Sequence, residues 1–301
     1  MTILDPAQLT ATSLGTAVMP VSSGSGLRRT WGRYRHDRMA MTALVILAVI
    51  VIVSAFAGVL APYDPTAVTP DVLAGPSPQH LLGNDDIGRD LLSRVLFGTR
   101  FSLLASLVAV ACATAAGSAI GLVSGYLGGK VDTVLMRLTD ALLAFPGLLV
   151  AMAIVGILGP GVQNAMLGLA VAFMPAFIRL VRGQVLAIRE EPFIEAATVS
   201  GVSGPTIVRR HVIPNIAGPV IVQGLATMGL ALLAEGALSF LGLSVQPPAS
   251  SLGSLLGRGF SVVNETVRLI LVPGLVITIV CWTFNAIADG LRQSLAAESE
   301  G

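Results

Sequence analysis

Glu235 has the surroundings that most suggest a chemical role, because it interrupts a long apolar run. It is the only charged residue between positions 212 and 243. A carboxylate at membrane depth costs about 2.5–3.5 kcal/mol, so such a residue faces the interior of a helix bundle or a wet cavity. Two roles remain open for Glu235. It contacts a solute's amino group or a gate, or it bonds to a neighbouring helix and fixes the bundle.

The motifs of several enzyme classes are missing from the sequence. It has no Gly-x-x-x-x-Gly-Lys-Ser/Thr loop for nucleotide hydrolysis, and its single lysine, Lys130, stands in a different context. Neither His-Glu-x-x-His nor a pair of aspartates occurs inside an apolar run, which argues against an intramembrane hydrolase. The three histidines and two cysteines are scattered, so we predict no metal site and no disulfide framework. The chain itself is not predicted to be an enzyme.

Composition places these residues in a membrane protein. Of the 301 residues, 54% are hydrophobic and only 12% are charged, whereas soluble proteins carry about 25% charged residues. Mean hydropathy is +0.83. The net charge of +1 excludes a strongly basic surface for nucleic acid. Lipid is therefore expected around most of the chain.

Apolar runs of about 20 residues, the length that crosses a bilayer as a helix, predict an all-α protein with six spans. The runs are Met39–Leu60, Phe101–Gly129, Ala141–Ile178 (broken into a hairpin of two spans at Gly159-Pro160-Gly161), Val212–Leu243 and Leu269–Ala288. Gly117, Gly121 and Gly125 are spaced by four, which predicts close helix packing. Pro146 should kink the third span, as a hinge or as a static bend.

The distribution of basic residues predicts that both termini are cytoplasmic. In that orientation 13 of the 18 basic residues face inward, and only Arg89, Arg94, Arg100, Arg258 and Arg268 face outward. The expected organisation is a cytoplasmic tail (1–38), a first span kept as an anchor (39–60), an external segment (61–100), a five-helix core (101–292) and a C-terminal tail (293–301). The core includes a cytoplasmic loop (190–215) and an external loop (244–268). Residues 1–26 are expected to be disordered.

The inward segment 190–215 has the signals of a short helix–turn–helix. Pro192 suits a first helical turn, and Gly201 can end that helix in the left-handed conformation. Ser203 and Pro205 should begin a second short helix, which Pro214 should terminate. Ala196 and Ala197 give the first helix a smooth face that would fit a partner's groove. The alternative is a charged amphipathic connector.

Charged residues also gather in two other regions, where local ion pairs are the expected role. Five charged residues on the outward side should form a solvated helix with local ion pairs, or contact an external partner; they are Asp85, Asp86, Arg89, Asp90 and Arg94. On the inward side, Asp140 should pair with Arg137.

The inward segment resembles the EAA loop of ABC importer permeases. The shared residues are Glu195-Ala196-Ala197, Gly201, and an ending Arg210-His211-Val212-Ile213-Pro214-Asn215 of the kind common in peptide-transporting members. His211 replaces the isoleucine of the general pattern.

A second, independent segment resembles the dipeptide and oligopeptide permeases of the DppC/OppC type. It runs from His80-Leu81-Leu82-Gly83-Asn84-Asp85-Asp86 through Gly88-Arg89-Asp90 to Arg94, with Asn84 where threonine is usual. The resemblance covers about residues 30–295. Departures occur at Leu252-Gly253 and in the C-terminal tail, away from the inward segment.

The resemblance implies the fold of a type I importer permease in the bacterial inner membrane. Such a chain forms a pore with a second permease, binds two cytoplasmic ATPases that carry the ATP and Mg²⁺, and receives peptide from an external binding protein or lipoprotein. It binds no cofactor itself. The coupling residues would be Glu195, Ala196, Ala197, Gly201, Pro205, Arg210, His211 and Pro214, with Glu235 and Pro146 as pathway or gate candidates.

Alternative functions remain at this point. Within the family, the substrate could be a nickel chelate, glutathione or another small solute. Outside it, a stand-alone secondary transporter is the remaining alternative, although six spans without visible inverted repeats argue against one.

Overall fold

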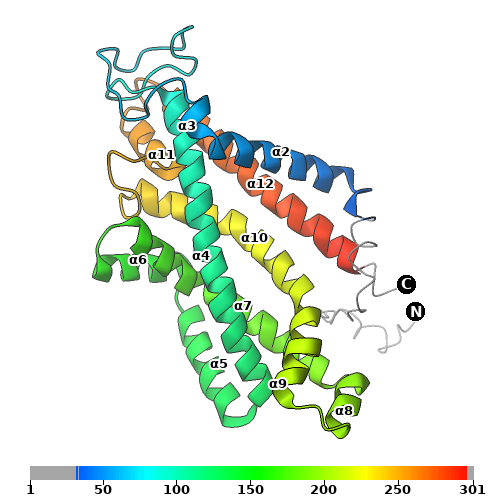
Figure 1. Ribbon diagram of the computed structural model, residues 1–301. Helices are drawn as coiled ribbons and strands as arrows, with labels where there is room; N and C mark the ends of the chain where they lie inside the picture. The colour runs from blue at the N-terminus through cyan, green and yellow to red at the C-terminus, as the bar shows by residue number, and fades with distance from the viewer. Residues whose placement is uncertain (1–31, 33, 297–301) are drawn as a thin grey trace, which may run out of the picture.

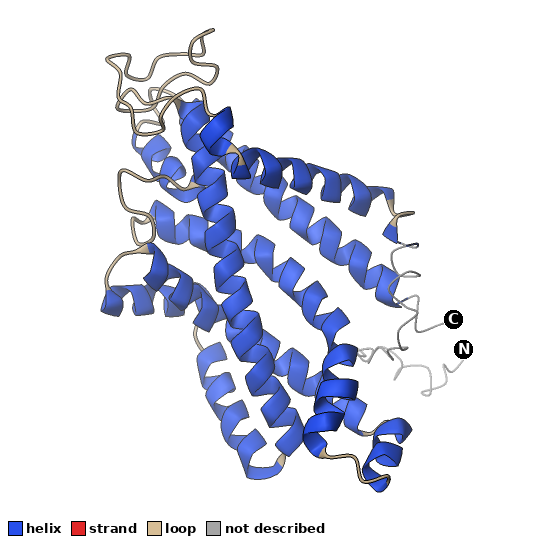
Figure 2. Ribbon diagram, in the orientation of Figure 1, coloured by secondary structure: helices blue, strands red, loops and turns tan. Residues whose placement is uncertain are grey.

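The computed structural model describes residue 32 and residues 34–296, and its regular elements are all helices (Figures 1 and 2). In chain order the elements are α2 (Arg38–Ala55), α3 (Ala57–Leu60), α4 (Leu91–Leu127), α5 (Gly129–Leu143), α6 (Gly147–Leu158), α7 (Val162–Arg189), α8 (Pro192–Val199), α9 (Gly204–Ile207), the π-helical turn η2 (Val208–Val212), α10 (Ile213–Phe240), α11 (Leu252–Ser261) and α12 (Arg268–Ala296). The disorder expected for residues 1–26 concerns residues outside this range.

Five of these helices are long and apolar enough to cross a membrane: α2, α4, α7, the continuous stretch Gly204–Phe240, and α12. A sixth span exists only if α5 and α6 are counted as one, and these two helices meet at an angle of 89°. The chain therefore bends at Pro146, as predicted, but the bend is large enough to divide the third span into two helices. Pro146 has no N–H to donate, and it disfavours helical geometry at Phe145, so the chain breaks there.

Helices α4 and α7 pack closely through the predicted glycine face. A Cβ atom added at Gly121 would lie 2.6 Å from the carbonyl oxygen of Ile178, and one at Gly117 would lie 2.7 Å from Cβ of Phe177. The packing prediction is confirmed. Because α5 also lies against α7, Asp140 pairs with Arg179 of α7 at 2.6 Å instead of with the predicted Arg137.

The main core joins α4, α10, α11 and α12. Leu232 of α10, Leu252 of α11 and Val280 of α12 are almost completely buried together. At this contact a Cβ added to Gly253 of α11 would lie 2.1 Å from the carbonyl oxygen of Gly236 in α10. Backbone therefore touches backbone, and α11 has little freedom to shift.

Two irregular regions lie at opposite ends of the bundle (Figure 1). We call residues 61–90 together with α11 the cap, and residues 190–207, which include α8 and α9, the α8–α9 loop. The cap surrounds the start of α4, whereas the α8–α9 loop connects the end of α7 to α10.

Candidate functional site

Helix α8 begins and ends at the predicted residues. Pro192 occupies its first turn, and Gly201 follows it with a φ of 75°, in the left-handed region. The N–H of Gly201 donates to the carbonyl of Thr198 at 3.0 Å, and that of Val202 donates to the carbonyl of Ala197 at 3.1 Å. These bonds satisfy carbonyl groups that a helix end otherwise leaves unpaired.

The two faces of α8 differ sharply. Ile194 is buried and Ala197 half-buried, in a small core shared with Val185 of α7 and Ile207 of α9. Glu195 and Ala196 are exposed on the other face, near Val199, whose side chain is 83% exposed. This exposed face, defined by Glu195, Ala196 and Val199, is available to a partner.

The second half of the loop differs from the prediction. Pro205 lies in the first turn of α9, as expected. Pro214 does not terminate the helix, which continues through η2 into α10. The N–H of Ile213 donates to the carbonyl of Val208, five residues earlier, and this wider turn makes room for a proline that would otherwise crowd the preceding turn. The loop is thus joined rigidly to α10.

Three contacts that sequence reasoning missed hold the α8–α9 loop in place. The ring of His211 lies against Phe193 of α8, with centroids 6.0 Å apart, while Arg210 beside it is exposed. Gly204 lies against Tyr126 of α4, and a Cβ there would be 2.6 Å from the tyrosine hydroxyl. Arg189, at the end of α7, lies over the same ring at 5.7 Å. No spacing in the sequence links these positions.

Glu235 faces the interior of the bundle, as predicted, with only 1% of the residue exposed. Its Oε1 accepts hydrogen bonds from the hydroxyl groups of Ser239 at 2.8 Å and Ser244 at 3.4 Å. Oε2 has no hydrogen-bond partner among the described residues. These contacts tie α10 to the segment that leads into α11, which favours the packing role; a gate role stays a prediction.

Pro146 lies at the start of α6 and is exposed. The adjoining residues Phe145 and Gly147 line a small cavity of about 40 Å³ together with Pro175 inside α7. The predicted site residues therefore fall into three places: the α8–α9 loop with η2, the interior face of α10, and the α5–α6 break.

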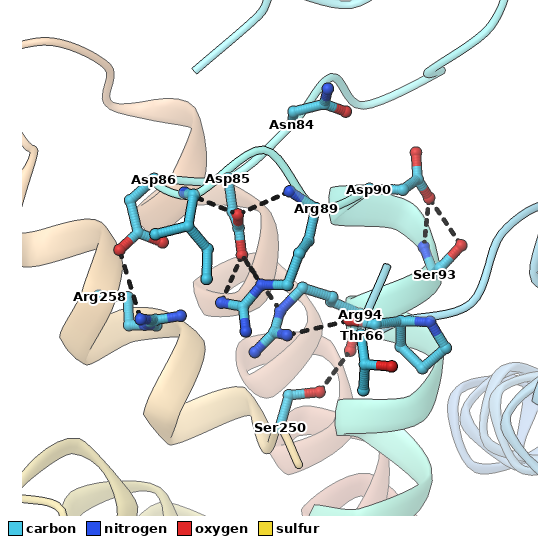
Figure 3. Close-up of polar contacts among 12 residues, drawn as sticks. Thr66, Asn84, Asp85, Asp86, Arg89, Asp90, Ser93, Arg94, Ser250 and Arg258 are labelled. Atoms are coloured by element: carbon cyan, nitrogen blue, oxygen red, sulfur yellow. Dashed lines mark hydrogen bonds and ion pairs between the residues drawn. The ribbon is translucent and has the colours of Figure 1, made fainter. Parts of the chain in front are cut away.

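The cap contains a buried ion network where a solvated helix was predicted (Figure 3). Asp85 contacts Arg89 at 2.7 Å and Arg94 at 3.3 Å, and all three side chains are at most 5% exposed. Arg94 also donates to the carbonyl oxygen of Pro65 at 3.0 Å. Asp90 caps α4 by accepting from the N–H of Ser93 at 2.8 Å, so the helix begins ten residues before the predicted span.

Further contacts tie this network to neighbouring helices. Asp86 lies 3.6 Å from Arg258 of α11, and Arg268 of α12 donates to the carbonyl oxygens of Ala74 and Asn84. Burial raises the pKa of Asp86, and the positive charge of Arg258 opposes the shift. Burial likewise raises the pKa of Asp85, against its backbone bond from Ile87 and the charge of Arg94.

Comparison with known families gives two matches. Residues 117–298 match the family described as the inner membrane component of binding-protein-dependent transport systems. Residues 25–76 match the N-terminal transmembrane domain of oligopeptide transport permease C.

Curated relatives are similar along nearly the whole chain. The dipeptide transport system permease protein DppC of Alkalihalophilus pseudofirmus is 38% identical over 269 residues, covering 89% of this chain and 88% of the relative. The glutathione transport system permease protein GsiD of Escherichia coli O6:K15:H31 is 38% identical over 273 residues, with 90% of each chain covered. A chain of the MetNI methionine ABC transporter, solved in inward-facing conformations, shares the fold. Its TM-score is 0.54 at 17% identity, with 65% of this chain and 94% of that chain covered.

Proposed function

Because this chain belongs to the family of binding-protein-dependent transport inner membrane components, and is thus a multi-pass permease of an ABC importer, we propose that it takes up di- or oligopeptides and couples to its ATPases through the α8–α9 loop. Membership of this family removes the support for a stand-alone secondary transporter.

The proposed topology has both termini in the cytoplasm. It places the α8–α9 loop inside the cell and the cap outside. The excess of basic residues on the inward side supports this orientation. The two regions lie at opposite ends of the bundle, which is consistent with their placement on opposite sides of the membrane (Figure 1).

The observation that carries the coupling proposal is the two-faced packing of α8. Its inner face is fixed in a small core with α7 and α9, while Glu195 and Ala196 face outward. A lever needs such a combination, because the partner must grip one face while the other transmits force without slipping. The continuous helix through η2 into α10 provides the transmission. Glu195, Ala196, Ala197, Gly201, Pro205, Arg210, His211 and Pro214 are the proposed coupling residues.

The proposed assembly contains a second related permease, two cytoplasmic ATPase subunits or domains and an external binding protein. ATP and Mg²⁺ would be bound by the ATPases, since this sequence lacks their phosphate-binding loop. Closure of the ATPases would displace α8 and switch the pore between outward and inward access.

The substrate class has two candidates, supported equally by the relatives. A protein named for dipeptides and one named for glutathione are both 38% identical to this chain. Both names describe short peptides or peptide derivatives. Uptake of a labelled dipeptide, measured with and without excess glutathione in the reconstituted complex, would separate the two.

Charge reversal at Glu195 tests the coupling role. In Glu195→Lys, we expect ATP-driven uptake to fall at least about tenfold, with unchanged amounts of folded chain in the membrane, because Glu195 is exposed and supports no internal contact. The measurement is uptake by the reconstituted complex, together with recovery of the ATPases on the tagged chain.

The matched control is Glu265→Lys, which makes the same change at an exposed position just before α12. It should leave recovery of the ATPases unchanged. Normal uptake by Glu195→Lys at equal expression would contradict the coupling role of α8.

A further inference from the structure

Three arginines share one face of α7 and each reaches the hairpin formed by α4 and α5. They are separated by three and seven residues, a spacing that keeps them on one side of a helix. Arg179 donates to Asp140 at 2.6 Å, and Arg182 donates to both carboxylate oxygens of Asp132, at 2.5 and 2.7 Å. Arg189 donates to the carbonyl oxygens of Gly125 and Tyr126, at 2.9 and 3.0 Å.

The contact between Arg182 and Asp132 differs from the other ion pair on this face. It is bidentate, and the two side chains are only 31% and 18% exposed. Asp132 also accepts a hydrogen bond from the hydroxyl group of Ser124 in α4, at 2.5 Å. One carboxylate therefore joins α4, α5 and α7. Arg179 and Asp140 are 55% and 60% exposed, and an ion pair so exposed to solvent stabilises the contact between its helices only weakly.

The position of this contact relative to the breaks in the chain gives it a mechanical meaning. Only Glu190 and Glu191 separate the end of α7 at Arg189 from the start of α8 at Pro192. In the other direction, α7 contains Pro175, which faces the α5–α6 break across the cavity of about 40 Å³. Pro175 lacks the N–H that would complete the helical bond to Val171, which lines the same cavity. Helix α7 is thus weakened at Pro175, at the same level of the bundle as the α5–α6 break.

The two sides of this level are held by different contacts. Beyond Pro175, α7 packs on α4 through Gly121 and Gly125, and is bound to α5 by Arg182. Before Pro175, it shares a small core with Ala109 of α4 and packs on α6 instead of α5. A Cβ added to Gly168 there would lie 2.9 Å from the carbonyl oxygen of Ala151. The break therefore separates α6 and the first half of α7 from α5 and the second half.

We propose that Asp132 and Arg182 are positioning residues for coupling: their ion pair makes α5 follow the second half of α7, so that a displacement of α8 reaches the α5–α6 break. This inference rests on the proposed coupling role of α8. Without the pair, α7 would move while α5 stayed behind, and the displacement would be lost before it reached α6.

Spin-label distances test whether the Asp132–Arg182 ion pair holds α5 to α7, without any partner protein. Labels are placed at Leu138 of α5 and Val199 of α8, both exposed, after Cys112 and Cys281 are replaced by alanine. In the isolated full chain we expect a narrow distance distribution that becomes at least about twofold broader in Asp132→Asn. Asp140→Asn, the matched change in the exposed pair, should leave it narrow. An equally narrow distribution in Asp132→Asn would overturn the inference.

Uptake per ATP hydrolysed in the reconstituted complex supplies the functional readout. Asp132→Asn should lower this ratio at least about tenfold at equal amounts of assembled complex, and Asp140→Asn should change it less than twofold. The double exchange Asp132→Arg with Arg182→Asp should restore at least a third of the ratio. A loss that only follows the yield of complex would overturn the positioning role. A wild-type complex without ATP-driven uptake would reject the proposed function instead. The label distances would still show whether the Asp132–Arg182 ion pair holds α5 to α7.

Discussion

The cap and the α8–α9 loop are both irregular regions, yet they are held in opposite ways. In the cap, Asp85 and Arg89 are buried with Arg94 of α4 in one ion network, and the adjacent Asp86 lies near Arg258 of α11 (Figure 3). Arg268 of α12 donates to the carbonyl oxygen of Ala74 in the same region. The α8–α9 loop rests on one small core, and its outer face is open to solvent. The difference suggests that the cap is a fixed frame and the loop a movable part, since local stability follows buried contacts.

Loss of Arg94 should break the frame and gives the largest expected effect. In Arg94→Met the buried carboxylate of Asp85 loses one of its two cations, and the carbonyl of Pro65 loses its donor. Breaking a buried pair from one side costs about 3–5 kcal/mol. We expect a loss of this size in the free energy of unfolding of the detergent-solubilised chain.

Arg179→Met is the matched control, because it removes an arginine from an exposed pair. The cost there should be about 0–1 kcal/mol. Similar losses in the two variants would show that burial does not distinguish these pairs, and the contrast between frame and loop would lose its electrostatic basis.

Glycine replacement compares packing at two positions, with a smaller expected effect. Gly253→Ala would place a methyl group 2.1 Å from the carbonyl oxygen of Gly236, so α11 must shift. Overpacking of this kind lowers the free energy of unfolding by about 1–3 kcal/mol. The measurement is the unfolding temperature of the purified chain, which should fall.

At Gly183, in the second half of α7, a methyl group meets nothing within 4 Å. Gly183→Ala should therefore raise the free energy of unfolding by up to about 1 kcal/mol through helix propensity. If both alanine variants were stabilised, α11 would be more mobile than its close contacts indicate.

Sequence reasoning succeeded where short-range signals decide the structure. Apolar run length located the spans, and Pro192 and Gly201 located α8, because each acts through the local backbone. It was wrong where distant segments meet. The charges of residues 85–94 suggested a solvated helix, and nothing local shows that α11 and α12 cover them. Pro214 suggested a helix end, whereas a π-helical turn accommodates it. Tyr126 and Arg189 escaped notice because their contacts join segments more than 60 residues apart.

The smallest expected effect on stability, and the most informative about the loop, comes from Gly201. Its φ of 75° suits glycine, is tolerated by asparagine and strains a β-branched side chain. Nothing lies within 4 Å of an added Cβ, so Gly201→Val disturbs only the backbone, at about 1–2 kcal/mol. Because the outer face of α8 is open, this strain can be relieved by local rearrangement of the loop, which leaves global unfolding nearly unchanged.

Transport should respond differently, since the proposed lever depends on the angle at which α8 meets α9. We expect Gly201→Val to lower uptake per ATP hydrolysed at least about tenfold, while Gly201→Asn retains most of it. A valine variant that transports normally would mean that the angle fixed by Gly201 is irrelevant to coupling. A variant that loses uptake only through loss of folded chain would place Gly201 with the frame, and the loop could no longer be described as the more movable of the two regions.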